Sequence, residues 1–538
     1  MENGTKGFIV TEDMDAMDEF SNRDRDVFLI NCERMIDRGA LMSRYSRTKE
    51  LDIRALWDKE FKGDEFRGEK FYERVFLEYG DESVSELVTA QLGVQNVSNV
   101  ITKIIEEGRI GLSYLEKSSR YVPYREKRGG RYLYTEADVA GIPQKFRSEY
   151  EQLCDSLFDF YIEALDEITP YLRENFPLEK AVFKLPDGTE LPYGSSNVPE
   201  ESMRKAYESA VRSRTLDEAR FILPSSTLTN LGISGNARGF AGMLERLKTS
   251  GLVEGESLYG SILKELRAVF PKLIDSVESP HGVEGIRYKS SLKSHIPLKI
   301  KGGFEITDQV VLLNYDDESS ALDRTISAYM FQRVEGGFPD MLESVSHLSM
   351  EEKRRVMGEI ASLRSSRRNK LDRSFEHTYY TFQITTNFGA FRDLQRHRMM
   401  SLQRKRISTK YGFEIPPIIG KMDDLLSKYR QLMNRADTLY RAMEKENGDV
   451  AQYVVPFAFR YPVIVTLNLR ELVYLTELRS TPQAHFDLRN ISRNMVKKVT
   501  EVHPAFSPLF KFVNWREEEL GRLAAELRKE IKKSNLIL

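Results

Sequence analysis

The sequence is poor in the residues that usually mark disulfide frameworks, metal sites and membrane spans. It has two cysteines, Cys32 and Cys154, in 538 residues, too few for a disulfide framework or a cysteine-rich metal site. All seven histidines lie from His281 onward, so any imidazole in a site has to come from the second half. No apolar stretch reaches the ~20 residues of a membrane helix, and the N-terminus lacks a signal-peptide pattern. We therefore expect a cytoplasmic protein with no metal site and no membrane partner.

An excess of charge of one sign is also missing. The chain has 80 basic and 82 acidic residues, a net charge of −2, whereas non-specific nucleic-acid binders normally show a basic excess. Nucleic acid is therefore not an expected partner. What is present, 41% hydrophobic and 30% charged residues, is typical of a globular protein. At roughly 100–200 residues per domain, the length predicts more than one domain.

A gapless internal repeat is the strongest feature of the sequence. Residues 217–247 align with residues 449–479 at an offset of 232 positions, and a weaker alignment at an offset of 290 sets Glu86 against Glu376. The identical pairs are Asp217/Asp449, Ala219/Ala451, Pro224/Pro456, Asn236/Asn468, Arg238/Arg470 and Glu245/Glu477. The proline after three apolar residues and the Asn-x-Arg that follows are not generic core patterns. The chain is therefore predicted to be a tandem duplication.

Helical and strand patterns occur in both copies. Apolar spacing predicts two helices within 71–102, a long helix over 145–176, and helices over 320–332, 374–398 and 421–445, while the run at 309–314 predicts a strand. We expect an α/β (α+β) fold of two tandem modules, each a sheet packed with long helices. The expected boundaries are a leader at 1–70, a first repeat at 71–278, a linker at 279–303 and a second repeat at 304–538.

The strongest local signal for chemistry is Arg396-His397-Arg398, at the end of an apolar, helix-like segment. Guanidinium groups place two parallel hydrogen bonds on phosphate oxygens, and a neighbouring imidazole can add a donor. The tripeptide therefore predicts an anion site. The alternative is a solvated basic face that pairs with acidic neighbours.

A second candidate lies in the first copy, in the loop that contains Glu116, Ser118, Ser119 and Arg120. Two hydroxyls and a guanidinium beside main-chain donors can bind a phosphate. The alternative is an ordinary polar turn.

The two copies have kept complementary residues. Arg220 of the first copy has Gln452 at the equivalent position, whereas Arg479 of the second has Leu247. Each copy lacks a cation that the other has. We therefore predict one anion-binding site to which both copies contribute.

Together these motifs resemble those of the flavin-dependent thymidylate synthases. The signature of that family is Arg-His-Arg followed by a spaced Ser, Glu, Ser and Arg-Tyr, with Ala-Arg-x-x-Leu-Pro and Asn-x-Arg downstream. The second copy matches it at Arg396, His397, Arg398, Ser401, Asn468 and Arg470. The first copy matches it at Ser113, Glu116, Ser118, Arg120, Tyr121, Ala219, Arg220, Leu223, Pro224, Asn236 and Arg238.

This resemblance implies a flavoprotein methyltransferase of nucleotide biosynthesis. It would methylate dUMP reductively to dTMP, using methylene-tetrahydrofolate, reduced FAD and NADPH at a composite site between the repeats. Family members are usually homotetramers, so a fused chain would form a homodimer that is a pseudo-tetramer. By the same resemblance the catalytic residues would be Arg396 and Arg479, the cofactor residues His377, Arg396, His397, Arg398, Asn468 and Arg470, and the substrate residues Glu116, Ser118, Arg120, Arg220 and Arg479.

Departures from the signature keep other functions open. Neither copy carries the whole signature, and Asp393 stands where the family commonly has glutamine. An acid there repels a phosphate at close range. The alternatives are a divergent FAD-binding enzyme of this fold that acts on another pyrimidine nucleotide or a folate-linked substrate, or a non-catalytic nucleotide- or flavin-binding protein.

Overall fold

The computed structural model describes residues 19–74, 82–184, 188–195, 198–298, 306 and 308–533. The chain forms two compact units. Described residues up to 95, 104–116 and 230–298 form the first, and 96–103, 117–229 and the described residues from 306 onward form the second. The second unit thus combines helices of the first repeat with the second repeat. Within the described ranges, no helix has both the length and the apolar character needed to cross a bilayer.

The first unit is built around a three-stranded sheet of order β1-β5-β2, most of whose residues belong to it. The strands are β1 (Thr89–Ser98), β2 (Leu112–Glu116) and β5 (Leu228–Asn236). Its helices are α1 (Met35–Tyr45), α2 (Ile53–Glu60), α3 (Arg67–Tyr72), the 3-10 helix η2 (Glu82–Leu87), α8 (Ala237–Lys248), α9 (Val253–Val269) and α10 (Pro280–Ser294). Strands β2 and β5 are antiparallel, with Leu112 opposite Gly235.

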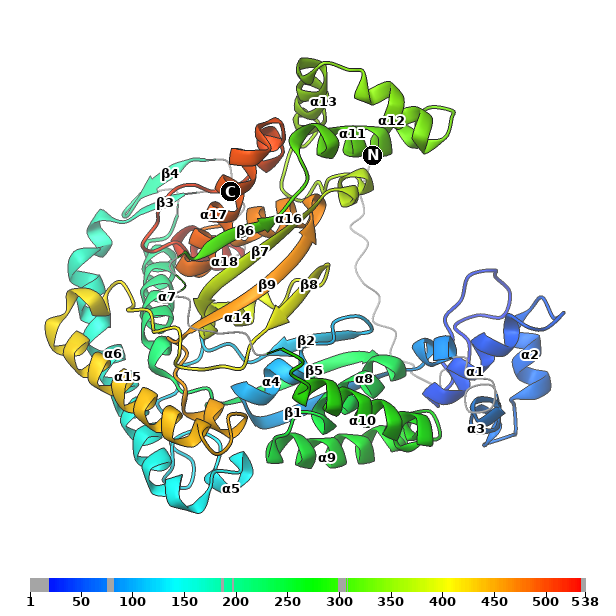
Figure 1. Cartoon of the computed structure of the whole chain (residues 1–538), viewed down its shortest axis with the longest axis horizontal. Coiled ribbons are helices and arrows are strands. Elements are labelled where there is room, and N and C mark those ends of the chain that lie inside the picture. Colours follow the sequence, from blue (N-terminus) through cyan, green and yellow to red (C-terminus); the bar gives the residue numbers. More distant parts are fainter. Residues whose placement is uncertain are drawn as a thin grey trace. The chain divides into compact units, whose positions relative to one another are not determined.

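The second unit contains a four-stranded antiparallel sheet of order β6-β7-β9-β8. Its strands are β6 (Val310–Asn314), β7 (Tyr379–Asn387), β8 (Met400–Arg404) and β9 (Arg460–Asn468). Both central strands are rich in aromatic and β-branched residues, which favour a half-buried pleated surface. Three helices pack against this sheet, namely α14 (Phe388–Leu394), α16 (Leu469–Arg479) and α17 (Phe486–Val502) (Figure 1).

The remaining elements of the second unit are mostly helical. They are α5 (Ala137–Ala140), α6 (Arg147–Asn175), α7 (Glu200–Ala219), α11 (Glu318–Phe331), α12 (Phe338–Ser346), α13 (Met350–Ser362), α15 (Asp423–Glu444) and α18 (Leu523–Lys533), with the short strands β3 (Val182–Lys184) and β4 (Glu190–Pro192) and the 3-10 helices η5 (Arg220–Ile222), η7 (Arg373–His377), η9 (Val450–Val454) and η10 (Pro504–Phe510). Helix α4 (Asn99–Ile105) has residues in both units. The long amphipathic helix expected over 145–176 is confirmed as α6.

The two copies share strand order and local hydrogen bonding. The order β1-β5-β2 recurs as β7-β9-β8. Asn236 and Asn468 each accept a backbone N–H to begin the helix that follows. Two residues further on, Arg238 pairs with Glu86 at 2.7 Å, and the equivalent Arg470 pairs with Glu376 at 2.8 Å. The predicted duplication and the mixed helix-and-sheet fold are therefore confirmed.

Inside the second unit the copies pair through a local two-fold arrangement. Pro224 and the equivalent Pro456 face each other in an antiparallel bridge. Ser225 N–H donates to the carbonyl of Val455 at 2.9 Å, and Phe457 N–H donates to that of Leu223 at 2.9 Å. A shift of 232 residues converts each of these hydrogen bonds into the other, because Ser225 is equivalent to Phe457 and Leu223 to Val455. Residues 223–225 of the first copy and 455–457 of the second are therefore joined as in a symmetric dimer.

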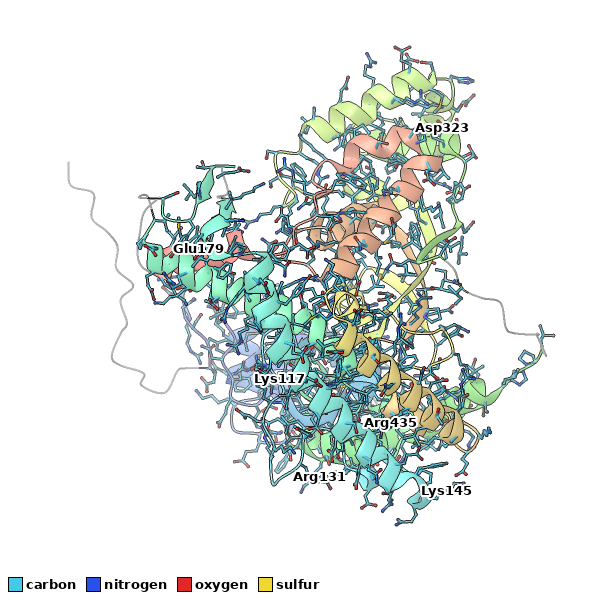
Figure 2. The ribbon with its side chains drawn as sticks, turned by 90° about the vertical axis from the view of Figure 1, so that its left-hand side faces the viewer. Lys117, Arg131, Lys145, Glu179, Asp323 and Arg435 are labelled. Carbon is cyan, nitrogen blue, oxygen red and sulfur yellow. The ribbon has the colours of Figure 1, made fainter. Side chains whose placement is uncertain are left out.

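The long helices α6 and α15 also come from different copies and lie side by side in this unit (Figure 2). Arg435 of α15 donates to Ser156 of α6 at 3.2 Å. The rings of Phe160 and Tyr429 lie 6.0 Å apart, centroid to centroid. Polar and aromatic contacts thus continue the pairing of the copies along these helices.

Three predictions of secondary structure from the sequence were wrong. Residues 89–98 and 379–387, expected to be helical, are the strands β1 and β7. Most of the expected linker at 279–303 is α10, which Ser279 caps and which has Pro280 in its first turn, where proline is tolerated. Part of that linker and the segment 75–81 lie outside the described residues. The domain boundaries stay a prediction.

Candidate functional site

A chain of hydrogen bonds links the second-copy candidates. Asn468 Oδ1 accepts the N–H of Glu471 at 2.8 Å, and Glu471 Oε1 lies 2.9 Å from His397 Nδ1. Arg479 Nε donates to His397 Nε2 at 2.9 Å, and its Nη2 donates to the carbonyl of Asp393 at 2.9 Å. Because His397 Nε2 accepts, the ring proton belongs on Nδ1, where it donates to Glu471. Buried His397 therefore fixes the direction of the Arg479 guanidinium.

Arg396 and Arg398 lie on either side of buried His397, in the turn between α14 and β8. Both are exposed. Arg396 Nε is 3.6 Å from Asp393 Oδ1. The predicted tripeptide thus places two cations at the surface around an internal imidazole.

In the first copy, Arg120 forms a two-bond ion pair with Asp217. Arg120 Nε and Nη2 lie 2.6 and 2.7 Å from the two carboxylate oxygens. Arg120 Nη2 also donates to the carbonyl of Gln483 at 3.2 Å, and Ser118 Oγ accepts the N–H of Arg120 at 3.2 Å. Asp217 therefore neutralises much of the charge that the loop was expected to offer a phosphate.

Arg220 differs from Arg120, because no carboxylate of the described residues binds its guanidinium directly. It is 3% exposed, and its Nη2 lies 3.5 Å from the carbonyl of Gly389. Its Nε has no hydrogen-bond partner among the described residues. Burial lowers the pKa of Arg220 to about 10, so it stays charged at neutral pH. A buried cation without a bonded anion is costly, and this position suits an anionic ligand.

Side chains from the two copies meet directly beside these arginines. Arg392 Nη1 lies 3.3 Å from Ser119 Oγ, next to Arg120. Gln395 Nε2 donates to the carbonyl of Lys103 at 3.0 Å. All four residues belong to the second unit. The segment before Arg-His-Arg therefore contacts the first-copy loop within one compact unit.

The electrostatics of Asp393 indicate the same convergence. Burial raises the pKa of this carboxyl, but Arg396, then Arg120, Arg479 and Arg220, lower it well below its usual range. Two of these arginines come from each copy. One buried acid therefore lies in the field of four guanidinium groups, and the arrangement suits recognition of phosphate or another oxyanion.

Comparisons with known proteins identify the family of this chain. Residues 37–272 and 321–505 match the family Thy1, described as thymidylate synthase complementing protein. The chain therefore belongs to the Thy1 family. A UPF0159 protein of Thermoplasma acidophilum is 47% identical over 500 residues, 93% of this chain and 99% of that protein. A UPF0159 protein of Chlamydia muridarum is 34% identical over 533 residues, 95% of this chain and 96% of that protein.

Other similarities cover a smaller part of the chain. The flavin-dependent thymidylate synthase of Saccharolobus solfataricus is 33% identical over 146 residues, 26% of this chain and 54% of that protein. Among solved structures, a UMP/dUMP methylase PolB from Streptomyces cacaoi bound with 5-Br dUMP is 16% identical, with a TM-score of 0.30 over 38% of this chain and 94% of that chain. The match of two separate stretches to one family confirms a duplicated Thy1-family chain.

The structure places the remaining predicted residues elsewhere. Exposed His377 ends η7, where its ring stacks on Phe338 with centroids 6.2 Å apart. Arg470 Nε donates to the carbonyl of Leu371 at 2.7 Å, and Asn468 caps α16. Glu116 is buried at the end of β2 in the first unit. Asn468 and Arg470 thus have structural partners that account for their recurrence in both copies of the Thy1 module.

The second copy's equivalents of the first-copy loop have local partners. Lys410 pairs with Glu444 at 2.6 Å, and Arg406 pairs with Asp449 at 3.0 Å. Gln452, the equivalent of Arg220, accepts a backbone N–H through Oε1 and donates to the carbonyl of Asp449 at 3.0 Å. Gln452 therefore replaces a buried cation with a neutral group that the fold satisfies.

Sequence reasoning missed several residues of this cluster. It did not foresee Asp217 as the partner of Arg120, although Asp217 is one of the six identities of the repeat. It also missed Arg392, the partner of Ser119, for which no motif gave a signal. His485 is fully buried, and its ring centroid lies 5.8 Å from that of Phe221. Burial lowers the pKa of His485 well below its ordinary value, so the ring is neutral.

Glu218, next to Asp217, makes the free energy of unfolding depend on pH. It is fully buried, with Oε1 2.7 Å from Arg214 Nη2 and Oε2 accepting the N–H of Ile418 at 2.9 Å. Burial raises its pKa from 4.5 to about 7, against the effect of Arg214. Since the folded pKa exceeds the unfolded value, folding takes up a proton between these values. The contribution of protonated Glu218 to the free energy of unfolding is therefore complete below pH 4.5 and is lost as the pH rises through about 7.

We expect Glu218→Gln to reduce the pH dependence of unfolding. The shift corresponds to about 3 kcal/mol of unfolding free energy between the two pKa values. Urea unfolding at about pH 5 and about pH 8 measures it. Glu208→Gln, on the exposed side of α7, is the control and should keep the wild-type dependence. Equal pH dependence in Glu218→Gln and wild type would contradict the assignment.

Proposed function

We propose that this Thy1-family chain methylates dUMP reductively to dTMP, using methylene-tetrahydrofolate and reduced FAD at a composite site formed by both copies. The observation that carries the proposal is that arginines of both copies act on one buried acid. Arg120 and Arg220 of the first copy, and Arg396 and Arg479 of the second, all lower the pKa of Asp393. Membership of the Thy1 family and similarity to flavin-dependent thymidylate synthases support it.

The residues around Arg-His-Arg fit a flavin cofactor. Arg396 and Arg398 present exposed guanidinium groups suited to a diphosphate, on either side of buried His397. These residues, with His377, would hold FAD. When bound and reduced, with NADPH as the source of electrons, the flavin supplies the hydride that the methylation needs.

The chain's own residues bind and orient the substrate in this proposal. Arg220, with Arg120 and Ser118, holds the phosphate of the nucleotide. Arg479, fixed by His397, positions the pyrimidine and stabilises negative charge that develops on it. The first-copy residues therefore contribute mainly to affinity, and Arg479 contributes also to the rate.

The state of the cysteines supports a mechanism without a protein thiolate. Cys32 and Cys154 are both buried. Burial raises the pKa of Cys32 to about 11 and that of Cys154 to about 12. Neither thiol is ionised to a useful extent at neutral pH. A flavin-dependent route, in which protein groups bind and polarise the substrate, fits this chemistry.

A second candidate is supported by the acids in the cluster. Asp217 binds Arg120 directly, and Asp393 lies among the arginines. Two carboxylates lower the net positive charge that a phosphate meets. In this second candidate, the chain is an FAD-binding enzyme of the same fold whose substrate is another pyrimidine nucleotide, or a folate-linked molecule, instead of dUMP. A homodimer that assembles four Thy1 modules is part of either proposal, and light scattering tests it.

Flavin binding is the first test of both enzymes. The purified chain is expected to show visible flavin absorbance or to regain it with FAD. Titration with dUMP should perturb the flavin spectrum, and dTMP should form with methylene-tetrahydrofolate and NADPH. Spectral change without dTMP would favour the second candidate. A chain with no flavin absorbance that FAD does not reconstitute would rule out both enzymes and leave a non-catalytic nucleotide-binding protein.

A paired variant locates the flavin. Replacing Arg396 and Arg398 together with alanine should weaken FAD binding at least about 10-fold, because two charge-assisted contacts are lost. The control replaces Arg367 and Arg368, two exposed arginines on another loop of the second copy. Equal loss in both double variants would show that general surface charge, not this turn, holds the cofactor.

A further inference from the structure

A segment outside both family-matched stretches crosses the second unit beside Arg120. Residues 514–522 join η10 to α18, and we call them the strap. The strap begins on the second copy, where Asn514 N–H donates to Ser480 Oγ at 3.0 Å. It ends on the first copy, because α18 packs on α7. It therefore connects the two copies over the face that carries α7 and α17.

The first half of the strap is held by two arginines of α17. Arg493 Nε donates to the carbonyl of Asn514 at 2.8 Å, and Arg493 also pairs with Glu517. Both terminal nitrogens of Arg489 donate to the carbonyl of Glu518 at 3.2 Å. An acidic stretch thus lies along a basic helix face. Its contacts are polar and partly exposed, the kind that form and break without unfolding the core.

The second half of the strap contacts both sides of the Arg120 loop. Gly521 lies against Pro482 so closely that a Cβ there would clash with the proline carbonyl. Arg522 lies over the ring of Tyr121, with its Cζ 4.4 Å from the ring centroid. Tyr121 follows Arg120 in sequence, and Pro482 precedes the residue whose carbonyl binds Arg120. The strap therefore sits against the first-copy candidate loop.

Beneath the strap is a small cavity with an arginine-rich lining. Its volume is about 20 Å³, and the lining includes Arg120, Arg214, Arg489 and Arg522. The Nε atoms of Arg214, Arg489 and Arg522 are buried and have no hydrogen-bond partner among the described residues. Arg489 and Arg522 are 5% and 8% exposed. At least two strongly buried guanidinium groups therefore line a cavity and keep unused donors.

The carboxylates near the cavity leave two of these cations, Arg489 and Arg522, unsatisfied. Asp217 is taken by Arg120, whereas Arg214 is paired with buried Glu218 at 2.7 Å and with half-exposed Glu519 at 3.4 Å. In the described part of the chain, Arg489 and Arg522 make no ion pair with a carboxylate. The acceptor of Arg489 is a neutral peptide carbonyl, and Arg522 meets an aromatic ring. Burying such charges is costly unless an anion compensates them.

We propose that the strap is a lid over a phosphate-binding pocket, in which Arg489 and Arg522 hold the anion. Two forked donors suit the oxygens of a phosphate group. A cavity of about 20 Å³ has room for one water and not for a phosphate. The strap therefore shifts when the anion enters, and Arg522 moves with it as part of the site. This pocket goes beyond the proposed function, since no family-matched residue supplies the lid.

The test is calorimetric titration of the full chain, without added flavin, with inorganic phosphate at low ionic strength. Wild-type protein is expected to bind, and Arg522→Gln to bind at least about 10-fold more weakly. Arg516→Gln is the matched control, because Arg516 is an exposed arginine of the same strap outside the cavity lining. Its affinity should stay within about two-fold of wild type. Equal phosphate affinity in wild type and Arg522→Gln, or equal losses in the two variants, would overturn the proposal.

Movement of the lid has its own readout. Trp515 lies on the strap, half exposed, and Trp57→Phe leaves it as the only tryptophan. Phosphate should change Trp515 emission. Gly521→Ala, which prevents close seating, should give the changed emission without phosphate. An unchanged Trp515 signal in a protein that binds phosphate would exclude the lid movement.

Two sources of the phosphate are distinguished by comparing ligands. If the pocket takes the phosphate group of a nucleotide, UMP should bind more tightly than inorganic phosphate, and Arg522→Gln should weaken both. If it takes free phosphate, saturating phosphate should leave UMP binding unchanged. Neither measurement requires flavin or turnover. A non-catalytic chain can therefore still show the pocket, and an active enzyme can still lack it.

Discussion

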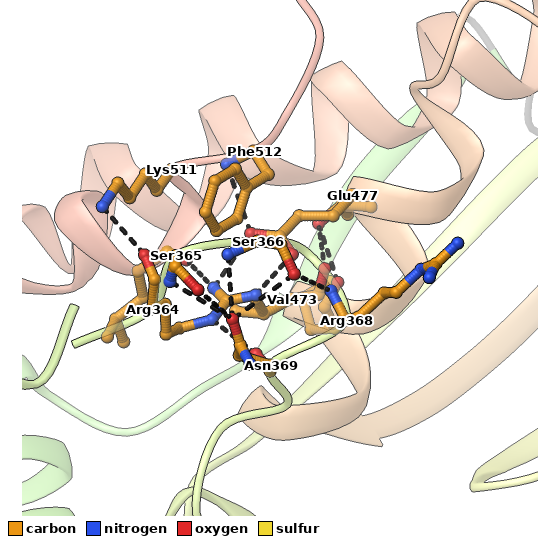
Figure 3. A network of polar contacts seen from close by, with 12 residues as sticks. Arg364, Ser365, Ser366, Arg368, Asn369, Val473, Glu477, Lys511 and Phe512 are labelled. Atoms are coloured by element: carbon orange, nitrogen blue, oxygen red, sulfur yellow. Dashed lines mark hydrogen bonds and ion pairs between the residues drawn. The ribbon is translucent and has the colours of Figure 1, made fainter. Parts of the chain in front are cut away.

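Replacing Glu477 with alanine is expected to lower the unfolding free energy of the second unit by about 3–5 kcal/mol. Glu477 and Arg364 form a two-bond ion pair with distances of 2.9 and 2.6 Å, and both are almost fully buried (Figure 3). Arg364 also donates to the carbonyl of Leu509 at 2.7 Å, and Glu477 accepts the N–H of Phe512 at 3.3 Å. Alanine at position 477 leaves Arg364 buried without a carboxylate, which is the costly case.

The repeat supplies the control for this variant. Glu245 is the first-copy equivalent of Glu477, but it pairs with Lys289 near the surface. Glu245→Ala should therefore cost less than about 1 kcal/mol. Urea unfolding of Glu477→Ala is followed by Trp515 of the second unit in a Trp57→Phe background, and that of Glu245→Ala by Trp57 of the first unit in a Trp515→Phe background. Equal midpoint shifts in the two variants would show that burial of the pair is not what stabilises this unit.

Removing either of two arginines from different copies is expected to reduce methylation at least about 100-fold in kcat/KM. Arg220→Ala removes a buried cation proposed to hold phosphate, so its effect should appear in the affinity for dUMP. The affinity for deoxyuridine, which has no phosphate, should change little. Arg479→Ala removes the guanidinium that His397 directs, so its effect should appear mainly in kcat.

The matched control for Arg220→Ala is Gln452→Ala, at the equivalent position of the second copy. Gln452 has local backbone partners, so dUMP binding should change by less than about two-fold. Direct titration with dUMP and with deoxyuridine, followed by steady-state kinetics, measures each effect. If Gln452→Ala weakened dUMP binding as much as Arg220→Ala, both copies would hold complete sites and the composite site would be wrong.

The duplication was predictable from the sequence, and four of the predicted site arginines act on the one buried carboxyl of Asp393. The recurring Asn-x-Arg pairs correspond to a helix cap and an ion pair in each copy. Each of these interactions requires a particular residue type at a fixed position, so the same residues recur in both copies of the sequence. Arg220 and Arg479 were noticed because their equivalents are uncharged.

The conformation of β1 and β7 was the main error in the predicted fold. Strands β1 and β7 were both expected to be helical, because their apolar residues also fit a helical spacing. Pairing with the neighbouring strand β9 decides the conformation of β7, and that strand is more than 70 residues away in sequence. A period within a short segment does not report such a partner. The same error in both copies follows from the equivalent places of β1 and β7 in the orders β1-β5-β2 and β7-β9-β8.

The contacts of the candidate loop were also beyond the sequence. Arg120 was expected to face a ligand, and the structure pairs it with Asp217, 97 residues away. Ser119 and Arg392 meet although 273 residues separate them. Motif spacing predicts which residues share a loop or a helix face. It does not predict which charges the fold neutralises internally.

The antiparallel bridge between Pro224 and Pro456 has a consequence for how such a chain evolves. In a dimer of identical subunits, every substitution appears on both sides of the axis, so a residue needed on one side has to be kept on both. Joining the two halves in one polypeptide removes that constraint, and each position can change alone. The equivalent positions Arg220 and Gln452, and Arg479 and Leu247, differ in a way that a dimer of identical chains cannot.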